Sequence, residues 1–578
     1  MDFDKLVAVY GELEKTASGN QMREILSEFF KKVSAEEINV IAYLTLGRIS
    51  SEFDDINLGM ADQMVLKAIA VAGGRDETKV KKLSKEKGDL GLAAEEIIKT
   101  KGRTLVPIGT LTVKEVFEKL HKLAGAEGSG SQDAKISILA SLLQKSSPQG
   151  AKYLCRIVLS TLRMGVGEMT VLDSLAIAFT GEKKNKEFLE NAYNICPDVG
   201  IIAGTIASSG LKGINKIGIR VGRPIKMMLC QRVENIEDIK EHIEGKIAVE
   251  EKYDGERIQA HKSKDKIILF SRRMENITHQ FPDIITELNQ NISAKEFVIE
   301  GEAVAIGKKG EFLPFQTLMQ RRRKYDIEKY VIDIPVRLHL FDVLYLNGES
   351  YLEESYLKRI KVLEKIIKPS KHLVQAKRVI TDDIEEVEDF FNHALEEGCE
   401  GIIAKSTAED SVYQAGTRGW LWIKWKRDYS SEMKDTVDLV VVGAFAGQGK
   451  RSGGYGALLC AVYNEKDDSF ETVSKLGTGF TDEQLEELPK MLNKYKLNHK
   501  SARVNARKEM KPDVWFEPRL VVEVLAAEIT QSPIHTAAFD GEKGLALRFP
   551  RFMKYREDKK AEQATTAKEL EQMWRKKR

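Results

Sequence analysis

The chain has 578 residues, and its 90 basic and 88 acidic side chains leave a formal net charge of only +2. A hydrophobic fraction of 42% is enough for packed cores and excludes a disordered chain. At roughly 150 residues per domain, this length predicts about three or four domains. The near-neutral total does not exclude nucleic-acid binding, because that depends on how Lys and Arg cluster on one surface.

The cysteines and the N-terminus indicate the compartment. Five cysteines are dispersed without CxxC spacing, which favours free thiols over disulfides or a cysteine zinc site. The first residues are acidic and then amphipathic, unlike a secretory signal. No apolar run approaches the ~20 residues that span a bilayer. We therefore expect a cytoplasmic protein of prokaryotic type, with no membrane association and no nuclear signal.

The first region, up to about residue 215, has helical periodicity. Apolar residues recur three and four apart, for example in Met22–Val33 and Ala151–Leu162. Gly128–Ser131 (GSGS) is a flexible break between helices. We predict an all-helical domain over residues 1–216.

The second region alternates apolar and polar residues with period two, as strands do. The alternating runs are Ile267–Ser271, Glu296–Ile306, Val336–Leu346 and Leu421–Lys426. Helical stretches such as Asp383–Leu395 separate them. This pattern predicts an α+β domain over residues 217–428 with antiparallel or mixed sheets.

The third region, residues 429–578, is β-rich. Val437–Val442 and Leu520–Leu525 are largely apolar strands, and the glycine-laden loop Gly447–Gly456 follows the first of them. A small barrel is expected here. Near the C-terminus, Thr566 and Glu569 form a capping-box pattern before apolar residues at helical spacing, which predicts a short terminal helix. The fold class is thus α, then α+β, then β.

A Walker A loop is absent. The nearest candidate is Gly449-Lys450, but Arg451 follows it, and the position that requires the first glycine holds Ala444. A glycine-rich hairpin loop is the alternative reading. ATP hydrolysis of the P-loop kind is therefore not expected.

The stretch Lys252–Arg257 (KYDGER) is the first candidate for chemistry. A lysine amine can attack phosphorus when it is deprotonated, which requires a pKa depressed by burial or by neighbouring positive charge. Asp254 and Gly255 suit a tight turn that holds the lysine at the floor of a pocket, and nearby Glu250 could contact a nucleotide. The alternative is a solvent-exposed charged turn.

Later strands add charged partners. Alternation puts Glu300 and Glu302 on one strand face, opposite an apolar face. In Leu421–Lys426, Lys424 and Lys426 share a face with Trp422, and the alternate residues face the core. Two adjacent lysines repel each other unless an anion such as a triphosphate lies over them. Solvated acids and an ordinary edge strand are the alternatives.

An aromatic residue on another strand is a candidate for base stacking. His339, Phe341 and Val343 share one predicted face. Phe341 on that face could stack on a purine, and a plain core position is the alternative.

Seven segments in chain order resemble the motif series of the ATP-dependent DNA ligases, most closely of the archaeal replicative type. They are EEKYDGER from Glu250, FSRRMENIT from Phe270, FVIEGEAVA from Phe297, LFDVLYLNG from Leu340, EGIIAK from Glu400, LWIKWKRDY from Leu421 and LRFPRFMKYRED from Leu547. That family belongs to the nucleotidyltransferase superfamily, together with mRNA capping enzymes and RNA ligases. The helical first region separates the chain from capping enzymes, and the missing four-cysteine zinc module argues against the NAD-dependent ligases.

The resemblance implies a fold and an activity. The three regions would be an all-helical DNA-binding domain, an adenylation (nucleotidyltransferase) domain and an OB-fold barrel with a C-terminal helix. The activity would be sealing of nicks in duplex DNA during replication, repair and recombination. ATP would be the substrate and Mg²⁺ or Mn²⁺ the cofactor. A covalent lysine–AMP and a DNA-adenylate would be the intermediates, and AMP would be released.

The resemblance also implies residue roles. Lys252 would become adenylylated, Glu250 would read the adenine amino group, and Phe341 would stack on the ring. Arg257 and Arg272 would contact ribose and phosphate, the latter also the 5′-phosphate of the nick.

The remaining implied roles concern charge neutralisation. Glu302 and Glu400 would hold the divalent metal, and Glu302 would also contact the nucleotide. The basic residues that would contact the phosphates or another part of the nucleotide are Lys424, Lys426, Arg418, Arg548 and Arg551, the last two orienting the pyrophosphate.

The resemblance implies partners and motion as well. The expected partners are nicked double-stranded DNA and a sliding clamp, and the enzyme would be a monomer. Gln21 and Phe29-Phe30 miss the usual clamp-binding register, so no clamp site is mapped. Because Arg548 must face ATP and later make way for DNA, we expect the barrel to rotate about a hinge near Lys426 to Asp435. We also expect the terminal helix to dock on the adenylation domain.

Two rival functions remain. A capping guanylyltransferase or RNA ligase would use the same lysine chemistry, and the labelling nucleotide would distinguish it. A non-catalytic DNA-binding scaffold with a decayed transferase fold is the second rival. The joint presence of Lys252, Glu302, Glu400, Lys424 and Lys426 argues against it.

Overall fold

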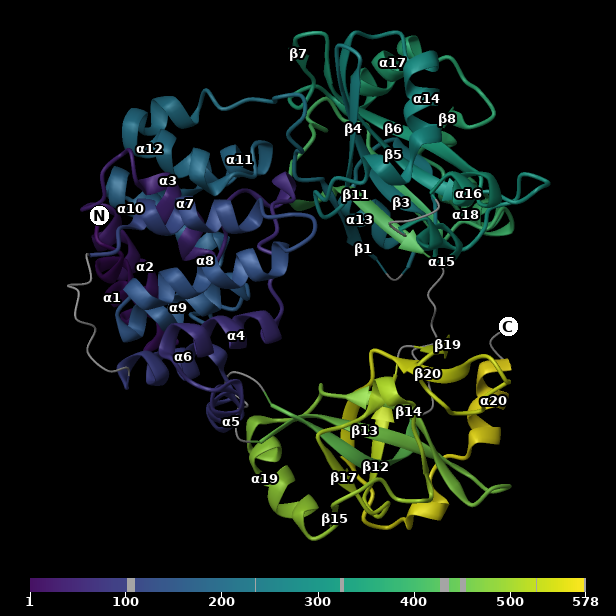
Figure 1. Cartoon of the computed structure of the whole chain (residues 1–578). Helices are drawn as coiled ribbons and strands as arrows, with labels where there is room; N and C mark the ends of the chain where they lie inside the picture. The colour runs from purple at the N-terminus through teal and green to yellow at the C-terminus, as the bar shows by residue number, and fades with distance from the viewer. Residues whose placement is uncertain are drawn as a thin grey trace. The chain divides into compact units, whose positions relative to one another are not determined.

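The computed structural model describes residues 1–100, 110–233, 235–322, 327–426, 436–447, 454–526 and 528–575. Figure 1 shows the helical first region in purple to blue, the mixed second region in teal to green and the β-rich third region in green to yellow. Each region is described by itself. No helix among the described residues combines the length and the apolar character that a membrane crossing requires.

The first region is helical, as predicted. Its helices are α1 (Phe3–Glu14), α2 (Gly19–Phe30), α3 (Ile38–Thr45), α4 (Asp62–Gly73), α5 (Glu77–Lys87), α6 (Leu90–Lys99), α7 (Val113–Ala124), α8 (Ser131–Lys145), α9 (Pro148–Val158), α10 (Glu168–Thr180), α11 (Lys186–Ile195) and α12 (Val199–Ile214). The start of α9 shows why the sequence folds in this way. Pro148 is its first residue, and the Ser147 hydroxyl accepts a hydrogen bond from the Gly150 N–H. Phe29 and Phe30 are 9% and 0% exposed, so these two phenylalanines are core residues rather than a clamp-binding motif.

The second region contains two sheets in its described part. The first sheet has the order β1-β11-β10-β2-β9 and the second the order β4-β3-β5-β6-β7, with β8 beside β6. The strands of the first sheet are β1 (Leu229–Arg232), β2 (Ile247–Lys252), β9 (Arg378–Thr381), β10 (Gly401–Ser406) and β11 (Arg418–Lys426). Those of the second are β3 (Glu256–Ser263), β4 (Lys266–Ser271), β5 (Glu296–Ala305), β6 (Val336–Leu346), β7 (Glu349–Ser350) and β8 (Leu373–Gln375).

Helices accompany these sheets, as predicted for an α+β region. They are α13 (Asp238–His242), α14 (Pro282–Asn291), α15 (Phe315–Leu318), α16 (Ile327–Asp333), α17 (Tyr356–Ile366) and α18 (Ile384–Glu396). The pairs β1–β11 and β6–β8 are parallel, and the neighbouring pairs β2–β10 and β3–β5 are antiparallel, so the sheets are mixed.

A β-bulge in β6 changes which side chains share a face of this strand. Gly301 pairs with Leu340 and Glu300 with Asp342, so Phe341 is the extra residue and the alternation shifts there. Val343 consequently packs in the core that lies under the second sheet, away from Phe341. The prediction that Phe341 and Val343 share a face is wrong, because a bulge re-aims the side chains that flank it.

The face assignment of β11 also needs correction. Trp422 is 3% exposed, and Ile423 on the opposite face is 0% exposed. Both faces of this strand are therefore buried at its centre, while Lys424 and Lys426 are partly exposed and Arg418 and Trp420 near its start are exposed.

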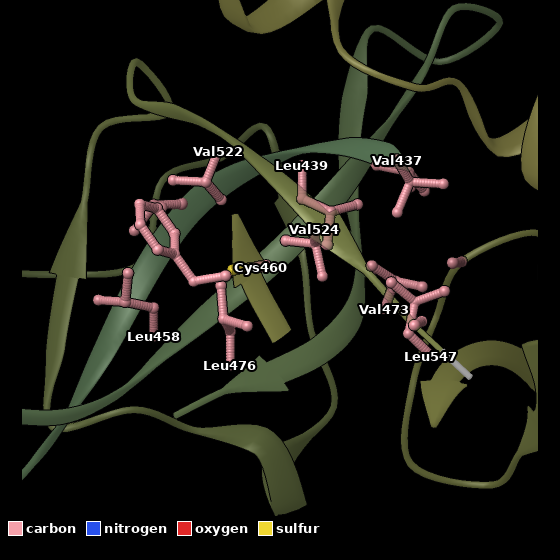
Figure 2. Packing of buried hydrophobic residues seen from close by; sticks show 14 of the residues in the cluster. Val437, Leu439, Leu458, Cys460, Val473, Leu476, Val522, Val524 and Leu547 are labelled. Atoms are coloured by element: carbon pink, nitrogen blue, oxygen red, sulfur yellow. The ribbon is translucent and has the colours of Figure 1, made fainter. Parts of the chain in front are cut away.

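The third region consists mostly of strands, as predicted. They are β12 (Val437–Ala446), β13 (Tyr455–Asn464), β14 (Ser469–Leu476), β15 (Lys496–Leu497), β16 (Val504–Asn505), β17 (Val514–Phe516), β18 (Val521–Leu525), β19 (Glu528–Ser532), β20 (Gly544–Arg548) and β21 (Arg551–Tyr555). The order β15-β17-β12-β13-β14-β16 forms the main sheet, and β18 pairs with both β12 and β21. Figure 2 shows its core, in which Leu439, Cys460 and Val524 meet. Helix α19 (Asp482–Asn493) contributes to the same core. Of the predicted glycine loop Gly447–Gly456, residues 448–453 are not among the described residues.

The terminal helix α20 (Ala567–Arg575) begins with the predicted capping box. The Thr566 hydroxyl accepts from the Glu569 N–H at 3.1 Å, and the Glu569 carboxylate accepts from the Thr566 N–H at 2.8 Å. Ala567 and Leu570 are buried in the core of the third region. The apolar stripe that was expected to dock on the second region thus packs within its own region.

The tail that leads into α20 is bound to the first strand of the third region. The Thr565 N–H donates to the Asp438 carbonyl, and the Asp438 N–H donates to the Thr565 hydroxyl, both at 2.9 Å. Arg556 contacts the Asp438 carboxylate and also lies 3.5 Å from the carboxylate of Glu523. The two acids that interrupt β12 and β18 lie opposite each other, so this guanidinium offsets their repulsion.

Candidate functional site

A bend between β2 and β3 carries the candidate nucleophile. Lys252 ends β2, and β3 begins at Glu256. A Cβ at Gly255 would lie 2.4 Å from the Ala303 carbonyl oxygen, so only glycine lets the bend approach β5 so closely. The Asp254 carboxylate accepts a hydrogen bond from the Phe315 N–H at 3.0 Å. The KYDGER stretch is therefore a fixed bend and not a free charged turn.

Strand register brings the candidate lysines together. On β10, Gly401 pairs with Lys252 on one side and with Lys426 on the other. On the same strand, Ile403 pairs with Glu250 of β2 on one side and with Lys424 of β11 on the other. Segments that are far apart in sequence thus form one short row across the sheet.

Most of the predicted residues line one cavity of about 550 Å³. Those that line it are Lys252, Arg257, Arg272, Glu302, Glu400, Arg418, Lys424 and Lys426. Glu250 and Phe341 line an adjoining cavity of about 60 Å³, together with Lys252, Arg257 and Glu302. The larger cavity also contains Arg273 and Arg322, which were not predicted.

Lys252 is held as an ammonium in this structure. Its Nζ contacts the Glu400 carboxylate in an ion pair. Burial alone would lower the pKa of Lys252, but the charge and hydrogen bond of Glu400 outweigh it and raise that pKa above its ordinary value. The expectation of a depressed pKa is thus wrong for the ligand-free state, because a carboxylate from β10 lies against the amine.

The cations that line the larger cavity repel one another. Burial, together with the positive charges of Lys252, Lys426 and Arg418, holds the pKa of Lys424 below its ordinary value. An anion over these groups would relieve that repulsion. That the paired lysines of β11 bind an anionic ligand stays a prediction.

The two predicted acids of β5, Glu300 and Glu302, have different environments. Glu300 is 0% exposed and accepts hydrogen bonds from Arg257 at 2.7 Å and from the Tyr413 hydroxyl at 2.9 Å. Glu302 is half-buried and lines both cavities. Burial raises the pKa of Glu302 to about 7, although Lys252 and Arg257 act in the opposite direction. Glu300 is therefore a structural partner of Arg257, and Glu302 is the acid that faces the cavity.

Glu250 has protein partners that sequence reasoning missed. Its carboxylate contacts the Tyr356 hydroxyl, Arg378 Nε at 3.3 Å and Lys405 Nζ at 2.6 Å. Lys405 is 1% exposed, and its Nζ lies 4.9 Å from the ring centre of Phe341. Lys405 belongs to the quoted EGIIAK segment, so the position was visible, but its burial beside Glu250 was not.

The remaining predicted residues lie in the third region. Arg548 ends β20 and forms an ion pair with Glu528 at 2.7 Å, and Arg551 begins β21 with an exposed side chain. Of the predicted hinge near Lys426 to Asp435, only Lys426 falls within the described residues.

Comparison with known proteins decides the family. Three family models match, described as DNA ligase N terminus (residues 2–176), ATP dependent DNA ligase domain (227–426) and ATP dependent DNA ligase C terminal region (451–559). The chain is 46% identical to DNA ligase 1 of Methanosarcina acetivorans, over 98% of each chain. It is 44% identical to the probable DNA ligase of Aquifex aeolicus, over 100% of this chain and 98% of that one.

The chain belongs to the ATP-dependent DNA ligases. It is thus a DNA ligase that uses ATP and a divalent cation such as Mg²⁺ and acts on nicked DNA. Roles in replication and repair are typical of this family. A solved structure named Pmar-Lig_Pre. shares the fold, with a TM-score of 0.55 and 19% identity over 96% of this chain and 99% of that one.

The carboxylates of this ligase fit a Mg²⁺ that is shared with phosphates. No group of three or more His, Cys, Asp or Glu suited to a metal occurs among the described residues. Glu302 and Glu400, however, both line the cavity that contains Lys252. Mg²⁺ commonly takes one or two carboxylates and completes its shell with water and substrate phosphates. A donor set of two carboxylates that line a cavity large enough for a nucleotide's phosphates matches that preference.

Proposed function

We propose that Lys252 of this ligase is the nucleophile that attacks the α-phosphorus of ATP. A bond forms between Nζ and phosphorus, and the bond from that phosphorus to the pyrophosphate oxygen breaks. The observation that carries the proposal is the shared cavity. The Lys252 amine, the Glu302 and Glu400 carboxylates and several further cations are among the groups that line about 550 Å³ of space. AMP then passes to the 5′-phosphate at the nick, and the 3′-hydroxyl displaces AMP to close the strand.

The amine must lose its proton before attack. The ion pair with Glu400 raises the pKa of Lys252 and lowers that of Glu400, so the proton stays on the amine while the pair holds and passes to solvent water once the pair is broken. A divalent cation on Glu302 and Glu400 would neutralise phosphate charge and compete with Lys252 for Glu400. In such transfers, positioning and charge neutralisation supply most of the rate.

We propose residue roles on the same basis. Glu250 accepts from the adenine amino group, Phe341 stacks on the base, and Arg257 contacts the ribose; their common small cavity supports this. The cationic residues proposed for the phosphates of ATP or of the nick are Arg272, Arg418, Lys424 and Lys426, with Arg548 and Arg551 for the pyrophosphate. Placement of the first four in the larger cavity supports their part of the proposal.

We propose three domains: a helical DNA-binding domain (1–216), an adenylation domain (217–428) and an OB-fold domain with a terminal helix (429–578). The strand-rich third region, whose strands bury two hydrophobic clusters, supports the OB-fold. We further propose a monomeric enzyme that has a sliding clamp as a partner. Sedimentation with and without a clamp tests both points.

Labelling tests the proposed chemistry. Incubation with α-labelled ATP should label the wild-type protein, and nicked DNA should then discharge the label. Lys252→Ala should give no labelled protein, and Lys246→Ala is a control at a nearby lysine outside the cavity-lining set. Appreciable labelling of Lys252→Ala would overturn the assignment, and labelling by GTP in place of ATP would favour the capping-type rival.

A further inference from the structure

We propose that Tyr356 and Arg378 are positioning residues that fix the Glu250 carboxylate for recognition of the adenine 6-amino group. The inference rests on the proposed role of Glu250 as the base-reading acceptor of the ligase. It adds two residues that lie outside the seven motif segments, on α17 and β9.

The geometry leaves Glu250 little freedom. Glu250 is 2% exposed, and its Oε1 accepts from the Tyr356 hydroxyl and from Arg378 Nε at 3.3 Å. Its Oε2 forms the ion pair with Lys405 at 2.6 Å. A carboxylate offers about four lone-pair sites, so about one remains. Because Glu250 lines the smaller cavity with Phe341, that site is available to a base stacked there.

Tyr356 is itself held firmly. It is 0% exposed, and its N–H donates to the Ser411 carbonyl at 3.0 Å and lies 3.1 Å from the Ser411 hydroxyl. Burial and the nearby charge of Glu250 keep the pKa of Tyr356 well above its ordinary value. The phenol therefore stays protonated and donates its single proton to Glu250.

The resulting charge pattern selects a base. The Glu250 carboxylate faces a phenol donor and two cations, so it acts as a hydrogen-bond acceptor. An acceptor at this position takes an N–H from the amino group of adenine and repels the O6 oxygen of guanine. A site that is built to bond an N–H discriminates strongly against analogues that lack it. Tyr356 and Arg378 act on selectivity through the orientation of this carboxylate.

The test compares two nucleotides in Tyr356→Phe. The labelling rate is measured against concentration for α-labelled ATP and for α-labelled purine riboside 5′-triphosphate, which lacks the 6-amino group. We expect the half-saturating ATP concentration to rise about ten-fold, as for one misplaced hydrogen bond to a charged group. The value for the purine analogue should stay unchanged. An equal loss for both nucleotides, or no change for ATP, would overturn the proposal.

The matched control is Tyr10→Phe. Tyr10 is also 0% exposed, and its hydroxyl contacts Thr45 at 3.4 Å in the helical region. This control should leave both half-saturating concentrations at wild-type values. If Tyr356→Phe does not fold, Arg378→Gln serves with the same two nucleotides and the same expected split.

A second experiment tests whether Tyr356 acts through Glu250. In a Glu250→Gln background, Tyr356→Phe should cause no further loss with ATP, because the carboxylate it orients is gone. An additive ten-fold loss would overturn the proposal. Failure of the parent assignment is separate, because it would appear as a Glu250→Gln single variant that keeps the wild-type half-saturating concentration for ATP.

Discussion

A buried ion pair makes the first residue-level prediction. Arg359 and Asp342 are both fully buried, and Arg359 Nε donates to the Asp342 carboxylate at 2.7 Å. Arg359→Ala should lower the free energy of unfolding by about 3–5 kcal/mol, since it leaves an uncompensated buried carboxylate. Urea denaturation followed by near-ultraviolet circular dichroism measures this. Lys358→Ala, on the exposed side of the same helix, is the control, and an equally small effect for both variants would contradict the prediction.

A second residue-level prediction concerns acid stability. Burial lowers the pKa of His261 from 6.5 to about 3, and its ring nitrogens contact the Gly222 N–H and the side-chain oxygen Oε1 of Gln259. Below about pH 6.5 the unfolded chain binds a proton that the folded chain excludes. Stability is therefore lost as the pH falls from about 6.5 toward 3, by about 1.4 kcal/mol per pH unit from this residue.

Calorimetry at pH 7 and pH 5 checks this dependence. The unfolding temperature should fall with pH in the wild type and fall less in His261→Asn. His339 also makes stability fall with pH, in the wild type and in the variant alike, because burial lowers its pKa to about 3. Identical pH dependence in the wild type and the variant would show that His261 does not contribute.

Sequence reasoning identified residues whose role depends on local motif chemistry. Lys252, Glu302, Glu400 and Lys424 were predicted, and the structure places them around one cavity. Tyr356 and Arg378 could not be predicted, because they reach Glu250 from 106 and 128 residues away. The direction of the pKa shift of Lys252 was also missed, because it depends on an ion pair between two strands.

The bend between β2 and β3 gives the first element-level prediction. In Gly255→Ala the new Cβ would lie 2.4 Å from the Ala303 carbonyl, so the bend and β5 must separate. Displacement of about 1 Å at a reacting centre costs on the order of 10²-fold in rate. We expect such a loss in the rate of protein labelling by α-labelled ATP. Gly204→Ala, where a Cβ meets nothing within 4 Å, should label normally, and a normal rate in Gly255→Ala would contradict the argument.

The cap of α20 gives the second element-level prediction. Thr566→Ala removes the hydroxyl that accepts from Glu569 and should destabilise this helix by about 1 kcal/mol. Hydrogen exchange of the α20 amides should accelerate accordingly. Thr566→Ser retains the oxygen and should restore protection. Equal exchange in the alanine and serine variants would show that the cap does not limit fraying.

Element boundaries followed well from periodicity, while local irregularities did not. Val336–Leu346 was predicted as a strand, and β6 has those same bounds. The bulge at Phe341 within it was not predicted, because a bulge depends on pairing with β5 rather than on alternation. Similarly, the apolar stripe of α20 was evident, but the core that receives it was not.

For the whole molecule, we predict salt-sensitive binding of nicked duplex that is indifferent to base sequence. Overall charge is only +2, so local clusters of cations such as those beside Lys424 must supply phosphate contacts. With about 6–10 such contacts, affinity should fall on the order of 10³- to 10⁵-fold between about 50 and 200 mM salt. Fluorescence anisotropy on two nicked duplexes of unrelated sequence measures this. A clear preference for one sequence would contradict the prediction.

Domain rearrangement during the reaction is the second whole-molecule prediction. We expect the third region to change its position between adenylation and sealing, about a hinge near Lys426 to Asp435. X-ray scattering of the free, adenylylated and nick-bound protein should give three distinguishable profiles. A single unchanged profile for the protein component would count against the rearrangement.

The contact between Asp438 and the C-terminal tail has a consequence for synthesis. Asp438 lies at the start of the third region, yet its backbone partner is Thr565, and Leu570 completes the core nearby. While the ribosome still holds the last residues, β12 lacks this partner and the core lacks α20. The first two regions can mature on the nascent chain, but the third closes only after release. A product truncated before Thr565 would therefore lack both this partner of β12 and the helix that completes the core.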